Sequence, residues 1–449
     1  MLQKRHYLWL ALLGWLCVPS ALMAQNNGGN NGGNFNVGGI RIDATGVVSM
    51  LAPARESATT SKKRQQAFLT ANVAGDLAKS TQSRRVSLRQ LDTQLTELAR
   101  NSQEIPLELR YLAGITRIEQ VVVDREQNDL SIIGPAEGFA PDVYGRMRGI
   151  VTGRPVLNLE DLLVAWRTVQ GGQTVVTCSI DPTQEGIAAF KAYSSQNQVA
   201  ATPAAIAGIF ETMAVRLGRQ EITLTGVPRD SHFAMVLVEA DLRMKRIALG
   251  KDPAGIRGVP SHLSLMRLGD ASMTRWWFIP LYDPIGVNAD RTRFELSGQR
   301  LQLLGQDEFT NFQGQRSVAA SNRLGTSKFV KEFTEHIPQL VEVQPSFAEL
   351  QNLFDWMVVC TLIKRQNLDA AISWNPVVLG DAKLLPVATY PVPESVDAVA
   401  ATHRIGRTTL GLVGGVELNA DNVISNTAPM AGDNARSIPA RHESRIWND

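Results

Sequence analysis

The chain has 449 residues, of which 44% are hydrophobic and 20% are charged, the composition of an ordinary globular protein. Its formal net charge of +2 at pH 7 gives no electrostatic basis for binding nucleic acid or an acidic surface. Its 3 cysteines are too isolated in the sequence to form a zinc-ligand cluster.

The N-terminus has the layout of a secretory signal peptide. Lys4 and Arg5 precede the apolar run YLWLALLGWLCV, and the small-residue stretch SALMA predicts cleavage after Ala24. The apolar run is too short to span a bilayer comfortably. We therefore expect an exported protein, periplasmic or extracellular in the cell envelope, with residues 1–24 removed and no integral membrane segment left. Loss of the leader's two cations brings the mature chain close to neutrality.

Low-complexity segments are predicted to flank the folded body. Residues 25–36 form an Asn/Gly-rich flexible tether, which has few side chains to bury and cannot recover its ordering entropy. Residues 426–449 are predicted to be a disordered tail for the same reason. Between them, a Gly/Pro-rich connection at 251–272 is predicted to separate an N-terminal lobe, 37–250, from a C-terminal lobe, 273–425.

The predicted elements of the N-terminal lobe alternate between helices and hairpins. A helix begins after the N-cap Ser87, because leucines recur there at helical spacing (Leu88, Leu91, Leu95 and Leu98). Residues 115–138 predict two strands joined by a polar turn. Asn158 and Ser231 are placed to cap two further helices, and strands are predicted between and before them.

Strands at 274–282 and 292–305 and helices around 326–336 and 346–364 are predicted for the C-terminal lobe. The apolar stretch FAELQNLFDWMVVCTLIKR contains acidic and amide side chains, so it predicts a buried core helix and not a membrane span. Helices and hairpins follow one another without regular strand–helix alternation. This order predicts an α+β fold with mixed sheets, hairpins and interspersed amphipathic helices in two packed lobes.

One pattern occurs near both ends of the chain: VGGIRIDATGVV at 37–48 and VGGVELNADNVI at 413–424. The first copy predicts strand, turn, strand, with Ile40 and Ile42 on one face, Arg41 on the other and Gly46 at a positive-φ turn position. In the second copy Asn422 can take the position of that glycine. The two hairpins could lie side by side and close the fold, although chance similarity over so short a stretch is a serious alternative.

Few residues are candidates for catalysis. A glycosidase needs two carboxylates facing each other, and Glu137 with Asp142 or Asp161 is the pair that the sequence offers. Asp161 also has a simpler role as a first-turn residue of its helix. The stretch IIGPAEGF around Glu137 lacks the G-K-[ST] ending of a phosphate-binding loop, so a strand-terminating turn is favoured.

Two stretches are candidates for binding. Arg243, Lys245 and Arg246 gather near a predicted helix C-terminus, where the helix dipole alone would favour cations. Trp276 and Trp277 point to opposite faces of a predicted strand, so one of them could bind a sugar ring or a partner while the other packs in the core.

No cofactor or metal is expected. The histidines are far apart, and none stands in an H-E-x-x-H frame. No G-x-S-x-G or S-x-x-K motif provides an activated serine. Cys178 and Cys360 remain after the leader is lost, each in an apolar context, and the sequence leaves open whether they are two buried thiols or one long-range disulfide.

An ordered set of segments resembles a known family. It comprises VGGIRIDATGVV, NDLSIIGPAEGF, TGRPVLNLEDLLVAWR, CSIDPTQEG, EADLRMKRIALG, RWWF and LSGQRLQLLGQDEF, from about Val37 to about Gly415. These segments are similar to a family of secreted proteins from planctomycete-type bacteria that is catalogued only as a domain of unknown function. The resemblance implies an exported bacterial protein of uncharacterised activity, and it brings no catalytic residues.

Two functional hypotheses follow. The first is a non-enzymatic binding or structural protein of the periplasm or cell envelope, whose partner would be an envelope glycan or another envelope protein. The alternative is a carbohydrate- or peptidoglycan-directed hydrolase that uses a carboxylate pair beside a tryptophan platform.

Overall fold

The computed structural model describes residues 35–52, 56–73, 75–196, 203–267, 273–399, 401, 412–430, 438–440 and 445–449. The expected signal peptide and nearly all of the expected tether lie outside the described residues. None of the helices among the described residues has the length and apolar character needed to cross a membrane.

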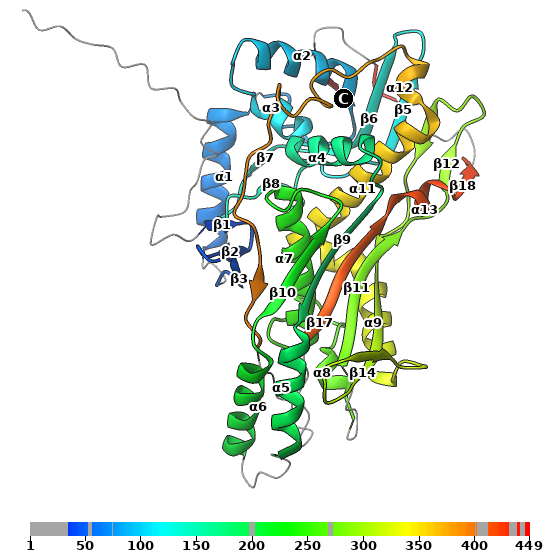
Figure 1. Cartoon of the computed structure of the whole chain (residues 1–449). Helices are drawn as coiled ribbons and strands as arrows, with labels where there is room; N and C mark the ends of the chain where they lie inside the picture. Colours follow the sequence, from blue (N-terminus) through cyan, green and yellow to red (C-terminus); the bar gives the residue numbers. More distant parts are fainter. Residues whose placement is uncertain are drawn as a thin grey trace, which may run out of the picture.

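The largest sheet runs through the centre of the molecule (Figure 1). Its strand order is β1 (Phe35–Val37), β2 (Ile40–Ile42), β3 (Val47–Met50), β16 (Ser395–Val396), β10 (Gln220–Thr225), β9 (Val175–Pro182), β17 (Leu412–Asn419), β11 (Met273–Leu281), β14 (Arg300–Thr310) and β15 (Arg316–Val318). Neighbouring strands are antiparallel except for the parallel pairs β3–β16 and β11–β17. The sheet is therefore mixed, as predicted.

A second sheet and a small hairpin complete the β-structure. The second sheet has the order β18 (Thr427–Pro429), β12 (Ile285–Val287), β13 (Arg293–Glu295), β5 (Gln120–Asp124), β6 (Asp129–Ala136), β4 (Thr81–Ser87) and β19 (Trp447–Asn448). The hairpin consists of β7 (Phe139–Pro141) and β8 (Met147–Gly149). Both large sheets combine strands from before and after residues 251–272, so that segment does not divide the sheets into an N-terminal and a C-terminal set. The α+β fold class is confirmed.

The helices are α1 (Ala58–Asn72), α2 (Leu88–Arg100), α3 (Leu107–Arg110), α4 (Leu159–Gln170), α5 (Gln184–Gln196), α6 (Pro203–Leu217), α7 (His232–Ala248), α8 (His262–Leu265), α9 (Leu324–Glu335), α10 (Ile337–Val343), α11 (Pro345–Gln366), α12 (Leu368–Ala371) and α13 (Ala420–Ile424). The predicted N-caps are confirmed. Ser87, Asn158 and Ser231 accept hydrogen bonds from backbone N–H groups in the first turns of α2, α4 and α7.

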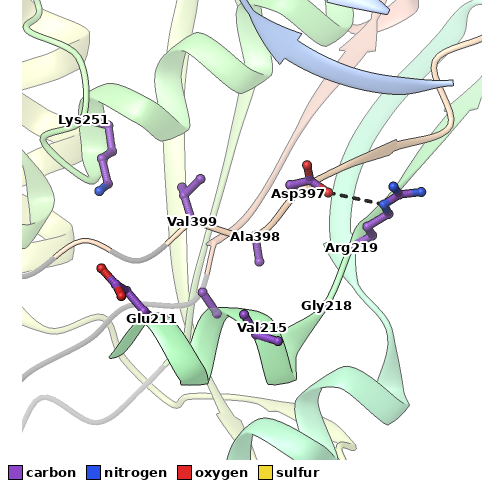
Figure 2. A pocket seen from close by; sticks show the side chains of 9 residues that line it. Glu211, Val215, Gly218, Arg219, Lys251, Asp397, Ala398 and Val399 are labelled. Atoms are coloured by element: carbon purple, nitrogen blue, oxygen red, sulfur yellow. Dashed lines mark hydrogen bonds and ion pairs between the residues drawn. The ribbon is translucent and has the colours of Figure 1, made fainter. Parts of the chain in front are cut away.

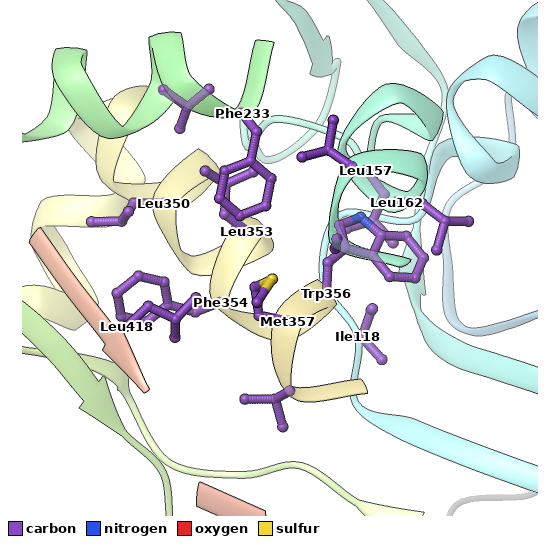
Figure 3. Close-up of a cluster of buried hydrophobic side chains, with 14 of the residues drawn as sticks. Ile118, Leu157, Leu162, Phe233, Leu350, Leu353, Phe354, Trp356, Met357 and Leu418 are labelled. Atoms are coloured by element: carbon purple, nitrogen blue, oxygen red, sulfur yellow. The ribbon is translucent and has the colours of Figure 1, made fainter. Parts of the chain in front are cut away.

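Helix α11 is the centre of the hydrophobic core. Its side chains are buried on every face from Ser346 to Ile363, as the apolar composition of this helix predicts. It packs on α4 and α7, and α7 in turn covers β9, β17 and β11 of the central sheet. Figure 3 shows Leu353, Trp356 and Phe354 of α11 beside side chains from α7, α4 and the central sheet, in that order.

A helical arm projects from one end of the body, away from the second sheet (Figure 1). It consists of α5 and α6, which pack on each other and are inserted between the antiparallel strands β9 and β10. The end of the β14–β15 hairpin lies against the start of α5, where Gln184 donates a hydrogen bond to the carbonyl oxygen of Gln313. Lys191 of α5 also donates a hydrogen bond to the carbonyl oxygen of Thr310 at the end of β14, and its ammonium lies 5.5 Å from the centroid of the Phe312 ring.

The two copies of the VGG pattern take different structures. In the first copy, Ile40 and Ile42 are buried, Arg41 is exposed and Gly46 has a φ of +76°, as predicted. The second copy was predicted to be a hairpin, and this is wrong: it forms one strand, β17, followed by helix α13. The copies share the central sheet but do not pair, because β16, β10 and β9 lie between β3 and β17.

Parts of the expected disordered tail are ordered. Strand β18 pairs in parallel with β12, and β19 pairs with β4. Trp447 is buried against the guanidinium of Arg84, and that guanidinium also pairs with Asp449, so the chain end gains contacts that its composition did not indicate. Cys178 and Cys360 are both buried and free.

Candidate functional site

Five charged side chains form a buried cluster between α4, α7, α11 and the β7–β8 hairpin. This charged cluster consists of Arg146, Asp161, His232, Glu239 and Glu349. Arg146 Nη2 lies 2.6 Å from Glu239 Oε2, and Arg146 Nε lies 2.8 Å from Glu349 Oε2. The Asp161 carboxylate oxygens lie 2.9 and 3.1 Å from His232 Nδ1.

Burial and mutual charge shift the pKa values of three groups in this cluster, and that of Arg146 is raised because the opposing effect of burial is outweighed by Glu239 and Glu349. Burial by itself lowers the pKa of His232, but the Asp161 carboxylate, assisted by Glu349 and Glu160, outweighs it and raises the pKa to about 9. Burial raises the pKa of Glu349 to about 7, against the attraction of Arg146. At neutral pH His232 is therefore an imidazolium, which stabilises the carboxylates but cannot act as a general base.

The Gly38–Gly39 turn between β1 and β2 lies directly on the charged cluster. A Cβ atom at position 38 would lie 2.5 Å from Arg146 Nη2, and one at position 39 would lie 2.4 Å from Glu239 Oε1. Both contacts are shorter than real Cβ contacts allow, and Gly38 also has a φ of +52°. The glycines of the first VGG copy thus let the backbone approach the Arg146–Glu239 ion pair.

The three carboxylates proposed from the sequence lie in different settings. Asp161 belongs to the charged cluster. Asp142 accepts hydrogen bonds from the backbone N–H groups of Tyr144 and Arg146, at 2.8 and 3.0 Å, and so shapes the β7–β8 turn.

Glu137, which is 3% exposed, stabilises the turn at Val151 and Thr152. It accepts hydrogen bonds from the backbone N–H groups of Val151 and Thr152, at 2.6 and 3.1 Å. Each of these carboxylates therefore has a structural partner, and this arrangement gives no support to a hydrolytic pair.

The cations proposed for binding are paired with acids of the same region. Arg243 and Arg246 both form ion pairs with Asp252, each at 2.8 Å. Lys245 is fully buried and lies 2.8 Å from Asp241 Oδ2, while burial raises the pKa of Asp241 to about 6. These side chains tie the end of α7 to the following loop and to the central sheet, and they do not form a surface patch.

The two tryptophans point to opposite faces of β11, as predicted. Trp276 has no exposed surface and packs against His262 and Phe329, with ring centroids 5.0 and 5.8 Å apart. Trp277 is half-buried, and the Arg275 guanidinium lies 5.8 Å from the centroid of its ring. Trp276 is thus a core residue, and only Trp277 reaches the surface.

A hollow of about 490 Å³ lies where the arm joins the body (Figure 2). Its apolar lining includes Val215, whose side chain is 78% exposed, together with Ala214, Ala398 and Val399. At one end Arg219 forms an ion pair with Asp397 at 3.3 Å, and Glu211 and Lys251 lie at the other end. The hollow is wide and open to solvent, since Val215 and Arg219 on its lining are exposed.

Sequence reasoning missed both features. His232 and Glu239 lie two turns apart on α7, but their partners Arg146, Asp161 and Glu349 come from distant parts of the chain, so no local motif joins the cluster. Their signal was the presence of charged residues inside otherwise apolar helices, which implies burial with a partner. The hollow had no sequence signal, because its walls come from α6 and the residues that follow it, the loop after α7 and the residues after β16. Among the described residues, no group of three or more His, Cys, Asp or Glu side chains is arranged to hold a metal ion.

Comparison with known proteins gives one match. Residues 178–262 match the model of a family described as "Protein of unknown function (DUF1598)". No curated protein matches the chain, and no solved structure matches it. The matched stretch runs from Cys178 in β9 through the arm, β10 and α7 to His262, and it supplies most of the lining of the hollow. The expected relation to a domain of unknown function is confirmed over that stretch, while the planctomycete source stays a prediction.

Proposed function

We propose that the chain is an exported, non-enzymatic binding protein of the cell envelope, and that it holds a polypeptide segment of another envelope protein in the hollow at the base of the arm. The observation that carries this proposal is Val215, a large apolar side chain that is 78% exposed in a concave, largely apolar surface. Removing an exposed valine side chain from water is favourable by about 1.5–3 kcal/mol, so such a residue favours association. The signal peptide predicted from residues 1–24 favours an envelope location.

The lining favours a polypeptide over a glycan. Sugar-binding surfaces commonly present an aromatic ring for stacking, and none of the nine residues that line the hollow is aromatic. The rim instead carries one acid and one base at each end, Glu211 with Lys251 and Asp397 with Arg219. An extended segment with apolar side chains at its centre and charged side chains towards its ends complements this arrangement.

In vivo photo-cross-linking tests the proposal. A photo-reactive amino acid replaces Val215 in the full chain with its own N-terminus, and the matched control places it at Val151, which is 69% exposed and does not line the hollow. We expect a discrete protein adduct in the envelope fraction from position 215 and none from position 151. Equal adducts from both positions, or an adduct confined to the cytoplasmic fraction, would contradict the proposal.

A substitution tests the partner class. Val215→Asp places a charge on the apolar floor, and it should leave the melting temperature within about 1 °C of wild type because the side chain is exposed. We expect the partner identified by cross-linking to lose at least about tenfold in affinity for this variant. Retention of that affinity would overturn the assignment of the hollow. If a purified glycan binds the wild type and Val215→Asp abolishes this binding, the ligand of the hollow is a sugar and not a polypeptide.

A further inference from the structure

The N-terminal hairpin, residues 35–50 with strands β1, β2 and β3, lies against the charged cluster and pairs with β16, the strand that leads into the wall of the hollow. Its Gly38–Gly39 turn lies on the Arg146–Glu239 ion pair, as the close Cβ distances show. Its buried face consists of Ile40, Ile42 and Val48, which belong to the main core. The hairpin is thus held by apolar burial along its length, and its first turn packs closely against the ion pair.

The last strand of this hairpin positions the wall of the hollow. Strand β3 pairs in parallel with β16, with Val47 opposite Ser395 and Val48 opposite Val396. The N–H of Glu394 donates a hydrogen bond of 2.8 Å to the carbonyl oxygen of Gly46. Strand β16 is only two residues long, and the chain continues from it directly into Asp397, Ala398 and Val399, which line the hollow. Because so short a strand has few bonds of its own, its position depends on β3 and β10.

We propose that the N-terminal hairpin is a strap that couples the charged cluster to the hollow: while the Gly38–Gly39 turn is seated on Arg146 and Glu239, β3 holds β16 and the wall at Asp397–Val399 in place, and release of the turn frees that wall. The regulatory consequence rests on the proposed function of the hollow. The coupling itself is a property of the chain without any partner.

A change in pH alters the charge of the cluster on which the strap rests. The charged and titratable groups facing it are Glu160 and Asp161 from α4, His232, Glu239 and Arg243 from α7, Glu349 from α11, Asp142, Arg146 and Arg148 from the β7–β8 hairpin, and Tyr390, whose hydroxyl donates to Glu160. As the pH rises, His232 loses its charge and Glu349 gains one. The carboxylates beneath the turn then outnumber the cations, and the repulsion among these side chains loosens the packing on which the turn rests.

Hydrogen exchange of the purified mature protein tests the coupling without a ligand. Gly39→Ala introduces a Cβ at the Glu239 carboxylate, and Gly380→Ala is the matched control, since no atom lies within 4 Å of a Cβ there. In Gly39→Ala we expect amides of residues 40–50 and also of residues 394–399 to exchange roughly tenfold faster than in wild type. Residues 120–124 in the second sheet should be unchanged, and Gly380→Ala should match wild type.

A second measurement uses only wild-type protein, so its result does not depend on whether the variant folds. Wild-type protein is compared at pH 6 and pH 9, after correction for intrinsic exchange rates, and both segments should lose protection together at the higher pH. Faster exchange in 40–50 without a change in 394–399 would overturn the coupling, as would unchanged exchange in both segments. Coupled exchange with no cross-link from Val215 would leave the strap intact and refute only the proposed function.

Discussion

The ion pair between Asp161 and His232 makes the stability of the protein depend on pH in a direction that can be worked out. The ordinary pKa of histidine is 6.5, and in the folded protein the pKa of His232 rises to about 9. A raised histidine pKa means that the folded state binds the proton more tightly than the unfolded state. Its stabilisation is therefore fully present below pH 6.5 and is lost as the pH rises through 9.

The size of this effect follows from the shift. One unit of pKa corresponds to about 1.4 kcal/mol, so the shift of His232 is worth on the order of 3 kcal/mol, reduced somewhat because 18% of its side chain is exposed. Asp161→Asn removes the main charge that raises this pKa and leaves the effect of burial, which lowers it. We expect the pKa of His232 in the variant to fall below about 6.5.

Two measurements check this prediction. NMR titration of the histidine ring signals gives the pKa of His232 directly in wild type and in Asp161→Asn. Urea denaturation gives the free energy of unfolding at pH 6 and at pH 9. Between these two pH values, this free energy should decrease by about 2–3 kcal/mol more in wild type than in the variant. Asp290→Asn, at an exposed carboxylate, is the control and should titrate like wild type. An unchanged pKa of His232 in Asp161→Asn would refute the electrostatic reasoning.

Three further predictions concern the core and the chain end. The raised pKa of Glu349 makes the folded state less stable as the pH rises from about 4.5 to about 7. Glu349→Gln removes this carboxyl, so the free energy of unfolding of the variant should vary less with pH over that window than that of wild type. Cys178 and Cys360 are buried and burial raises their pKa values, so a thiol reagent should label neither in the native protein and both in urea; labelling before unfolding would contradict their burial. Removal of residues 445–449 leaves Arg84 buried without Asp449, which should lower the free energy of unfolding by about 3–5 kcal/mol, and an unchanged denaturation midpoint would show that the ordered chain end adds no stability.

The local structure of this chain could be predicted because its signals lie within a few neighbouring residues. Ser87, Asn158 and Ser231 cap helices since each side chain accepts a bond from a backbone N–H two or three residues ahead. The alternation of Ile40, Arg41 and Ile42 and the left-handed conformation of Gly46 follow equally from strand and turn geometry. The buried helix α11 was evident from a long apolar run.

The similarity of the two VGG copies illustrates the limit of such signals. The first copy, residues 37–48, contributes to three strands at the edge of the central sheet. The second copy, residues 413–424, forms a strand within that sheet and the helix that follows it. The difference arises because β17 pairs with β11 over residues 412–416 and with β9 over residues 414–419, and both strands lie far from it in the sequence. Pairing partners, and not the local pattern, decided which structure each copy takes.

The sequence by itself therefore determined the α+β class, the ends of several helices, the opposite orientations of Trp276 and Trp277 and the burial of the most apolar helix, because each depends on spacing within one element. The tertiary structure alone decided the strand order, the ordered chain end, the partner of Asp161 and the hollow beside Val215. Each of these brings together residues that are tens to hundreds of positions apart, and the free energy of such contacts is not encoded in any single stretch of the chain.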